Sequence, residues 1–332
     1  MINRRKFGKL PNGHDVHAFD LTSAGGLSAT VLEYGATLQS LRLPSGLDVV
    51  LGFDDLASYL GPHPYFGAAI GRIANRLRGA AFEVEGKRYV VAANEGVNSL
   101  HGGPDGFDRA VWTGAIDGDR LALTHISPDG HQGYPGRVEA QMIFSLSGHT
   151  LSLDMTARTD KTTPINLTHH SYFNLTDGGA TPAVDHELTV LCDEYLELDD
   201  AQVPAGRVLT AAGTAFDYAA PKAISPDLDH CFVKHHDAQN SSVKKLAKLV
   251  SKRTGNALII CSTQPAMQIY SGGTIGRHIG KGGAAYGNHH GIALEPQNFP
   301  NAVNEKSFPS PLLAPEKLYH QTIRYTLKET SE

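Results

Sequence analysis

The segment from 143 to 158 reads Ile143-Phe144-Ser145-Leu146-Ser147-Gly148-His149-Thr150-Leu151-Ser152-Leu153-Asp154-Met155-Thr156-Ala157-Arg158. Its second half alternates apolar and polar side chains, with the apolar ones at Leu151, Leu153, Met155 and Ala157. A period of two is typical of a half-buried β-strand. The turn Ser147-Gly148-His149 lies between this run and another apolar run, so the segment predicts a β-hairpin.

The same pattern recurs along the chain. Phe82-Glu83-Val84 and Tyr89-Val90-Val91 flank the turn Glu85-Gly86-Lys87, and segment 185–193 predicts a further strand. Segment 241–253 has apolar residues at helical spacing, but a turn and a β-rich run follow it, so we predict a hairpin there. Helix signals are weak, with one or two turns expected at 54–60. Many short strands with Gly- and Pro-rich turns predict an all-β fold, a large β-sandwich or a barrel.

Length and composition narrow the class of protein. The chain has 332 residues, of which 41% are hydrophobic, and neither a repeat nor a break in composition marks a linker. We therefore expect a single domain over 1–332. A net charge of −5 at pH 7 and a pI near 6.4 give no reason to expect a nucleic acid or an anionic membrane as partner.

Cysteine usage and apolar runs indicate the compartment. No apolar run approaches the roughly 18 residues that a membrane span needs. Three widely spaced cysteines argue against a disulfide framework and favour a reducing, cytoplasmic location. The start Asn3-Arg4-Arg5-Lys6-Phe7 resembles a twin-arginine signal, but the polar, turn-like residues that follow do not form the apolar region such a signal requires.

Polar clusters interrupt the strand-like sequence at four places, and a weaker one lies at Asp227-Leu228-Asp229-His230. The four are Gly71-Arg72-Ile73-Ala74-Asn75-Arg76, Asn98-Ser99-Leu100-His101-Gly102-Gly103, Asn166-Leu167-Thr168-His169-His170-Ser171-Tyr172-Phe173-Asn174-Leu175, and Leu294-Glu295-Pro296-Gln297-Asn298-Phe299-Pro300. Together they supply the bidentate polar groups and aromatic faces that a sugar site needs.

Each cluster also has a simpler interpretation. His101 can be a turn histidine, Glu295 a solvated strand-end carboxylate, and Arg76 and Asp229 surface charges. His169 and His170 can be read as a metal site, but adjacent side chains of a strand point to opposite faces, so the two can hardly share one ion. From composition and spacing alone, the sequence predicts a polar pocket on a β fold.

Taken together and in order, these motifs resemble the aldose 1-epimerase (galactose mutarotase) family. The match also includes Phe7-Gly8-Lys9-Leu10-Pro11-Asn12-Gly13 and Thr263-Gln264-Pro265-Ala266-Met267-Gln268-Ile269-Tyr270, and it runs from about residue 7 to 327. The resemblance implies a β-supersandwich with an open, shallow sugar cleft. The sequence departs from the family pattern at Gly272-Gly273, where family members often have Gly-Asn, and at His169, where they also have Asn.

The resemblance also implies roles for individual residues. Glu295 corresponds to the family's catalytic base and His170 to its acid. His101, Arg76, Asp229 and Gln268 correspond to residues that hold the ring oxygen or the hydroxyls, and Asn75 is a plausible further contact. The implied function is cofactor-free interconversion of the α and β anomers of free aldohexoses such as galactose and glucose. We expect no metal, a monosaccharide as the partner, and a monomer or weak homodimer.

Anomer exchange requires one base and one acid. A carboxylate of pKa about 4.3 and a histidine of pKa about 6.5 are correctly charged together only near pH 5–6 if unperturbed. At neutral pH, His170 would have to stay protonated, and we expect nearby carboxylates, Asp229 or Glu295 itself, to raise its pKa.

Three alternatives remain open at the level of sequence. The first is a non-catalytic sugar-binding or regulatory protein on the same fold. The second is a glycoside hydrolase that uses Asp229 and Glu295, which would leave the His101 and His170 clusters unexplained. The third is an epimerase of hexose 6-phosphates, for which the motifs offer only Arg72 and Arg76 to bind the phosphate.

Overall fold

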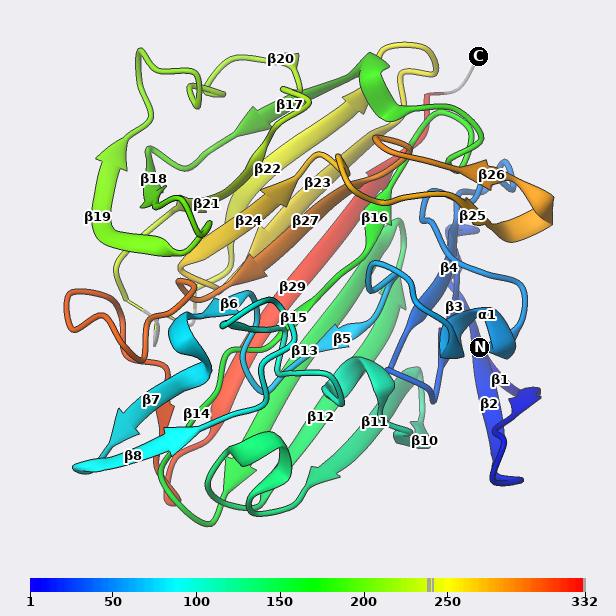
Figure 1. Cartoon of the computed structure of the whole chain (residues 1–332). Helices are drawn as coiled ribbons and strands as arrows, with labels where there is room; N and C mark the ends of the chain where they lie inside the picture. The colour runs from blue at the N-terminus through cyan, green and yellow to red at the C-terminus, as the bar shows by residue number, and fades with distance from the viewer. Residues whose placement is uncertain (238–239, 241, 331–332) are drawn as a thin grey trace.

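The computed structural model describes residues 1–237, 240 and 242–330, and its regular structure is almost entirely β (Figure 1). The largest sheet is antiparallel and nine-stranded. Its strands, in spatial order, are β10 (Thr113–Asp117), β11 (Arg120–Ser127), β12 (Val138–Ser147), β13 (Thr150–Thr159), β29 (Tyr319–Lys328), β23 (Ala257–Ser262), β22 (Lys244–Ser251), β17 (His186–Val190) and β20 (Lys222–Ala223).

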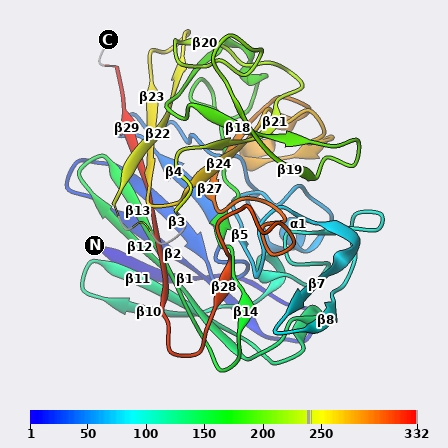
Figure 2. The same cartoon turned by 90° about the vertical axis from the view of Figure 1, so that its left-hand side faces the viewer.

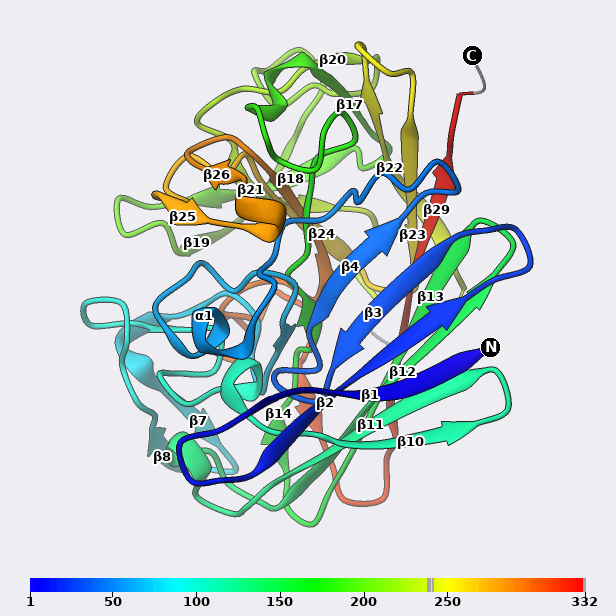
Figure 3. The same ribbon diagram turned by 90° about the vertical axis from the view of Figure 1, so that its right-hand side faces the viewer.

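Two further sheets pack on the nine-stranded one. A six-stranded sheet has the order β16 (Tyr172–Phe173), β27 (Ile292–Gln297), β24 (Ala266–Tyr270), β21 (Asp229–Val233), β18 (Glu194–Leu198) and β19 (Pro204–Thr210). A four-stranded sheet consists of β1 (Ile2–Lys9), β2 (Asp15–Thr22), β3 (Ser28–Leu32) and β4 (Leu38–Arg42). Figure 3 shows this sheet alongside β10 to β13.

Short strand pairs complete the described structure. They are β5 (Ala69–Ile70) with β15 (Thr168–His169), β6 (Arg76–Leu77) with β9 (Ser99–Leu100), β7 (Ala81–Val84) with β8 (Lys87–Val90), β14 (Thr163–Pro164) with β28 (Leu312–Leu313), and β25 (His278–Ile279) with β26 (Ala285–Tyr286). The helix α1 spans Leu56–Leu60, and short 3-10 turns occupy Arg78–Ala80, Phe107–Arg109, His131–Gly133, Ala183–Asp185 and Lys281–Gly283. In Figure 2, β29 and the β7–β8 hairpin lie on opposite sides of the molecule.

One hydrophobic cluster joins the three large sheets. Phe19 of β2, Leu153 of β13 and Leu294 of β27 are all fully buried members of it. Because Leu294 points into this core, its neighbour Glu295 points to the opposite face of the six-stranded sheet. The all-β sandwich predicted from the sequence is confirmed, and this outer face of the second layer is where the polar motifs gather.

The predicted hairpins and the short helix are present. Strands β12 and β13 pair with Ser147 opposite Thr150, and burial along β13 alternates as the sequence does. The β7–β8 turn contains only Glu85 and Gly86, both at positive φ (54° and 74°), so Lys87 already belongs to β8. The α1 helix begins at the expected place because Asp55 Oδ1 accepts a hydrogen bond from Ser58 N (2.9 Å).

The ambiguous segment 241–253 forms a strand, as predicted, and the structure explains its helix-like spacing (residue 241 itself lies outside the described part). The pairing of β22 with β23 shifts between Lys245 and Ala247. A bulge of this kind places two consecutive residues, Leu246 and Ala247, in the core, which breaks the period of two. In the described residues, no helix is long and apolar enough to cross a membrane.

Candidate active site

All seven residues singled out from the sequence line one cleft of about 170 Å³ on the outer face of the six-stranded sheet. They are Asn75, Arg76, His101, His170, Asp229, Gln268 and Glu295. The sheet register explains three of them, because Gln268 of β24 lies opposite Glu295 of β27, and Cys231 of β21 lies opposite Gln268. Asp229 is two residues from Cys231 and therefore shares the same face.

The other four come from loops and short strands that cover this face. Arg76 begins β6, which pairs with Leu100 of β9, and His101 directly follows β9. The turn after His101 requires glycine, because Gly102 has φ +91° and a Cβ there would lie 2.0 Å from the Gly71 carbonyl oxygen. This close approach of the two polar motifs brings His101 and Arg76 to the same cleft.

Glu295 and His170 face each other at the bottom of the cleft. His170 Nε2 lies 3.5 Å from Glu295 Oε1, and the two side chains are only 5% and 2% exposed. Within the described part of the chain, the second atom of each group, Glu295 Oε2 and His170 Nδ1, has no hydrogen-bond partner. The fold thus holds the pair in contact at a site from which water is excluded.

Burial controls the protonation of this pair. Desolvation raises the pKa of Glu295 well above its ordinary value; the negative charge of Asp229 adds to this and Arg76 opposes it. Desolvation lowers the pKa of His170 to about 3. The expectation that nearby carboxylates raise the pKa of His170 is therefore wrong, because the loss of solvent is the largest cause and the neighbouring His169 and His63 lower the pKa further. Both shifts favour the neutral forms, a protonated Glu295 and a neutral His170.

His101 is a neutral hydrogen-bond donor toward the cleft. The backbone N–H of Asn75 donates to His101 Nδ1 (3.1 Å), so the ring's own proton lies on Nε2. Burial, with the neighbouring His170 and Arg76, lowers the pKa of His101 well below its ordinary value. Asn75 and His101 both have positive φ (63° and 54°), a conformation that non-glycine residues adopt at some energetic cost.

Arg76 is fixed by carboxylates rather than free. Its Nε and Nη2 donate to both oxygens of Glu95 (2.7 and 2.9 Å), and its Nη1 lies 3.7 Å from Asp229 Oδ2. The other oxygen of Asp229 accepts from Gln268 Nε2 (2.5 Å). These charged and amide groups therefore form a connected chain across the cleft, and the contacts between them fix the orientation of each group.

Sequence reasoning missed Glu95 and three tyrosines. Glu95 also lines the cleft, and only its proximity to the Asn98–Gly103 motif could have suggested it. Tyr65, Tyr172 and Tyr270 form the aromatic walls, and the Tyr65 ring lies 4.7 Å from that of His101. Such faces pack against the C–H patches of a sugar ring.

The two adjacent histidines of the motif separate as predicted. His169 is fully buried on the core side, where its ring nitrogens contact Ser171 Oγ (3.0 Å) and the Ala36 carbonyl oxygen (3.3 Å). Arg72 also points away from the cleft, because its guanidinium binds Ser127 and the carbonyl oxygens of Pro128 and Pro135. Neither residue can contact a ligand in the cleft.

One group of potential metal ligands lies in the cleft. His101, His170 and Glu295 each place one ligand atom within 4.8 Å of the others. However, His101 Nδ1 already accepts a hydrogen bond and its Nε2 carries the proton, so this ring has no lone pair free for an ion. Two ready ligands are fewer than the three protein ligands of a catalytic zinc site. The donor set fits a sugar better than a metal.

Comparison with known proteins identifies the family. The family model described as aldose 1-epimerase matches residues 17–326. The chain is 40% identical to a galactose mutarotase of Homo sapiens, with 97% of each chain covered, and 32% identical to an aldose 1-epimerase of Escherichia coli strain K12, with 95% of this chain and 96% of the relative covered.

Solved structures give the same result for the fold. An aldose epimerase homologue from C. elegans superposes with a TM-score of 0.86 at 28% identity, covering 94% of this chain and 98% of the other. A galactose 1-epimerase from Lactobacillus acidophilus superposes with a TM-score of 0.83 at 28% identity, covering 100% and 99%.

Proposed function

The chain belongs to the aldose 1-epimerase family, and we propose that Glu295 and His170 are the acid–base pair through which it interconverts the anomers of free aldohexoses. The activity itself, an isomerase reaction, follows from the full-length relatives. The observation that carries the residue assignment is the buried contact between His170 Nε2 and Glu295 Oε1 at the base of the only described cleft that holds all the polar motifs.

The reaction needs one proton removed and one supplied. In ring opening, the Glu295 carboxylate takes the proton of the C1 hydroxyl while protonated His170 gives its proton to the ring oxygen. The bond between C1 and the ring oxygen breaks, and C1 becomes an aldehyde. After rotation about C1–C2, closure runs the same steps in reverse on the other face of the carbonyl. General acid–base catalysis of this kind contributes about 10²–10⁴-fold per group.

The unliganded protonation state matches one half of this cycle. A protonated Glu295 and a neutral His170 carry the same number of protons as the charged pair that opens the ring. They are equipped for closure, in which the carboxyl group protonates the aldehyde oxygen and His170 accepts the proton of the attacking hydroxyl. Ring opening requires that proton to pass from Glu295 to His170, over the 3.5 Å that separates them.

The surrounding groups orient the sugar. His101 Nε2 offers a donor for the ring oxygen or a hydroxyl, and Arg76, Asp229 and Gln268 supply donors and acceptors with fixed directions. Asn75 Oδ1 already accepts from Arg76 N, so its amide N–H₂ is the part left for a ligand. Galactose and glucose are the substrates we propose.

The geometry disfavours the rival enzyme classes. A phosphate would need a cluster of cations, but Arg72 is bound elsewhere and Arg76 is already paired with Glu95. A glycoside hydrolase would use Asp229 as a second carboxyl group, yet Asp229 is engaged by Gln268 and Arg76. A non-catalytic sugar-binding protein would have no need for a buried carboxyl group opposite a histidine.

We further propose that residues 1–332 act as a single domain, as a monomer or weak homodimer, without nucleic-acid or membrane partners. The core cluster that connects all three large sheets supports one domain. The free state of Cys192, Cys231 and Cys261 supports a reducing, cytoplasmic location.

Polarimetry of freshly dissolved α-D-galactose tests the pair. We expect Glu295→Gln and His170→Asn each to lower the enzymatic rate above the spontaneous background at least 100-fold, because each removes one partner of the proton exchange. His169→Asn is the matched control, since this neighbour faces the core, and it should keep near wild-type activity. Near wild-type rates in either cleft variant would remove that residue from its role. Sugar binding without acceleration in the wild type would favour the non-catalytic alternative.

A further inference from the structure

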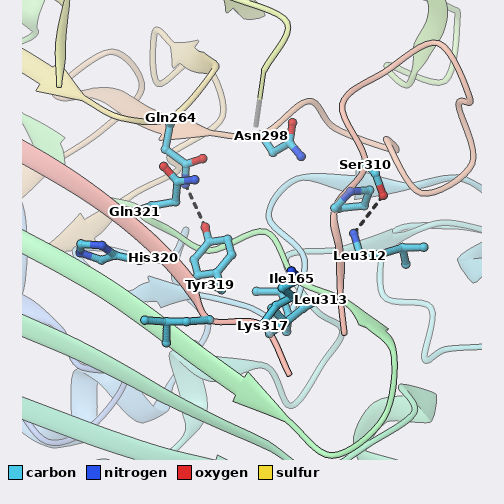
Figure 4. Close-up of a pocket in the computed structure, with 12 residues that line it drawn as sticks. Ile165, Gln264, Asn298, Ser310, Leu312, Leu313, Lys317, Tyr319, His320 and Gln321 are labelled. Carbon is cyan, nitrogen blue, oxygen red and sulfur yellow. Dashed lines mark hydrogen bonds between the residues drawn. The ribbon is translucent and has the colours of Figure 1, made fainter. Parts of the chain in front are cut away.

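The two segments that end in the catalytic pair continue into the wall of a second pocket. Ile165 and Asn298 line this pocket, whose volume is about 310 Å³, whereas His170 and Glu295 line the sugar cleft. Figure 4 shows Tyr319 in this pocket, between Gln264 and the apolar group of Ile165 and Leu313. Each segment therefore faces the sugar at one end and the second pocket at the other.

Side chains fasten these two segments to each other. Asn166 Nδ2 donates to the Asn298 carbonyl oxygen (3.1 Å), and Asn298 N donates back to Asn166 Oδ1 (2.8 Å). Two residues further on, Thr168 Oγ1 donates to the Pro296 carbonyl oxygen (2.6 Å). The β-ladder between the two segments, β16 with β27, begins only at Tyr172, so on the other side of His170 the separation from Glu295 depends on these side-chain contacts.

Leu167 lies in the middle of this arrangement, and Tyr319 and Gln264 hold its main chain. Leu167 N–H donates to the Tyr319 hydroxyl (3.2 Å), and Gln264 Nε2 donates to the Leu167 carbonyl oxygen (3.0 Å). Gln264 Nε2 also donates to the Tyr319 hydroxyl (3.0 Å; dashed line in Figure 4). Gln264 is 1% exposed, so water cannot readily substitute for its amide.

His170 has no comparable support of its own. Its Nδ1 has no hydrogen-bond partner in the described part of the chain, and its backbone is bonded only on the side of β5, through Ala68 and Gly67. On the side facing β27, the chain is fixed by the Thr168–Pro296 hydrogen bond two residues before His170 and by the pairing of Tyr172 with Ala293 two residues after it. Tyr319 and Gln264 hold the Leu167 main chain, which leads into this stretch, so the position of Leu167 affects that of the imidazole.

We propose that Tyr319 and Gln264 are positioning residues for the acid–base pair: together they fix the Leu167 main chain and so hold His170 at the distance from Glu295 that proton exchange requires. Neither residue touches the sugar cleft, so they act on catalysis through Leu167 and not through binding. This inference rests on the proposed function of Glu295 and His170.

Tyr319→Phe tests the inference, because it removes one hydroxyl group and nothing else. We expect kcat for α-D-galactose to fall roughly tenfold with KM within about twofold, since misplacement of a reacting group by a fraction of an ångström costs rate rather than ground-state binding. Tyr325→Phe is the matched control. Tyr325 lies on the same strand β29 and is 1% exposed, but its hydroxyl has no partner among the described residues, so kcat should not change.

Gln264→Met provides a second variant that keeps the side-chain volume and removes the amide. We expect the same fall in kcat, and in the double variant an effect smaller than the product of the two, because both residues act on one main-chain segment. All rates are measured per folded protein, well below the thermal midpoint of each variant. Should Tyr319→Phe fail to fold, Gln264→Met decides.

The outcomes distinguish a failure of the positioning role from a failure of the proposed function. The positioning role is overturned if Tyr319→Phe and Gln264→Met keep full kcat while the wild type and Tyr325→Phe accelerate mutarotation equally. The same conclusion holds if the variants lose thermal stability and the folded fraction retains wild-type kcat, or if KM alone changes. If the wild type itself gives no acceleration, the proposed function fails instead.

Discussion

Burial acts on both Glu295 and His170, the proposed catalytic pair, and in each case it favours the neutral form. It raises the pKa of Glu295 and lowers the pKa of His170 to about 3. The pair therefore keeps one proton over a wide range of pH. If the two residues act as proposed, we expect catalysis to end on the alkaline side when Glu295 loses that proton, because a carboxylate beside a neutral imidazole has no acid left to protonate the ring oxygen.

Asp229→Asn should move this alkaline limit to lower pH. The negative charge of Asp229 is one cause of the raised pKa of Glu295, so its removal lets the carboxyl group ionise earlier as the pH rises. We expect the alkaline decline of kcat/KM to move to lower pH, in addition to a loss of sugar affinity.

The pH profile of kcat/KM, measured by polarimetry, checks this. Asp227→Asn is the control, since Asp227 is exposed and two residues away, and its alkaline decline should coincide with that of the wild type. If the alkaline decline of kcat/KM in Asp229→Asn stays at the same pH or moves to higher pH, Asp229 does not raise the pKa of Glu295.

At the level of residues, the sequence predicted which residues line the cleft better than it predicted their burial and pKa shifts. The motifs named Glu295 and His170, but the direction of the His170 shift depends on how completely other segments exclude water, which no local pattern encodes. Glu95 was missed for the same reason. A lone carboxylate in a turn is ordinary in sequence, and only the fold brings it against Arg76.

At the level of the elements, a buried ion pair helps to attach the β25–β26 loop to the rest of the molecule, together with a hydrogen bond from Gly282 N to Asp54 Oδ2 (2.7 Å). Lys281 Nζ donates to Asp48 Oδ2 (2.6 Å) and to the Gln39 carbonyl oxygen (2.7 Å), and the Lys281 side chain is 8% exposed. Burial lowers the pKa of Lys281, and Asp48 opposes this shift. The loop begins near Thr274, which lines the sugar cleft, so its attachment also bears on the site.

Lys281→Met should destabilise the protein by roughly 2–4 kcal/mol, because it leaves the buried carboxylate of Asp48 without its lysine partner. The lower part of that range is favoured, since Arg42 also lies 3.2 Å from Asp48 and retains part of the compensation. Urea unfolding measures the loss. Lys306→Met removes an exposed lysine and serves as the control. A loss below about 0.5 kcal/mol would mean that Arg42 alone neutralises Asp48.

The sequence predicted strands and hairpins well because their signal is local. Alternation in 150–159 and the turn at Glu85-Gly86 correspond directly to β13 and the β7–β8 hairpin. The helix-like spacing in 241–253 could not be resolved in the same way. A bulge at Leu246 mimics a helical period, and whether a strand contains a bulge is decided by its partner, here β23.

For the molecule as a whole, the sandwich creates both the cleft and a reserve of buried histidines. No local pattern could join Glu295 to His170, which are 125 residues apart in the chain; the resemblance to the family placed them together, and the pairing of β24 with β27 provides the geometry. The fold buries His169 fully and His63 and His125 partly, and the loss of solvent lowers the pKa of each to about 4.

These histidines make the stability depend on pH, and the sign follows from proton counting. Between about pH 6.5 and 4 the unfolded chain binds protons at these rings and the folded protein does not, so each contributes stability that is lost as the pH falls. Asp108 acts in the opposite sense. Burial raises the pKa of Asp108 to about 7, so the folded protein binds this proton at a higher pH than the unfolded chain does. As the pH falls, Asp108 therefore increases the stability of the folded protein.

His169→Asn isolates one of these contributions without touching the cleft. The asparagine amide occupies the place of Nδ1 and can keep the hydrogen bond to Ser171 Oγ, while the long contact of Nε2 to the Ala36 carbonyl oxygen (3.3 Å) is lost, and the amide does not titrate. Between pH 7.5 and 5, the wild type should lose roughly 2 kcal/mol more unfolding free energy than the variant, which is 1.36 kcal/mol for each of the 1.5 pH units below the ordinary histidine value. Urea unfolding at the two pH values measures the difference, with the exposed His14→Asn as the control that should behave as the wild type. Parallel losses in all three proteins would show that His169 is protonated in the fold, and would contradict its burial as a neutral ring.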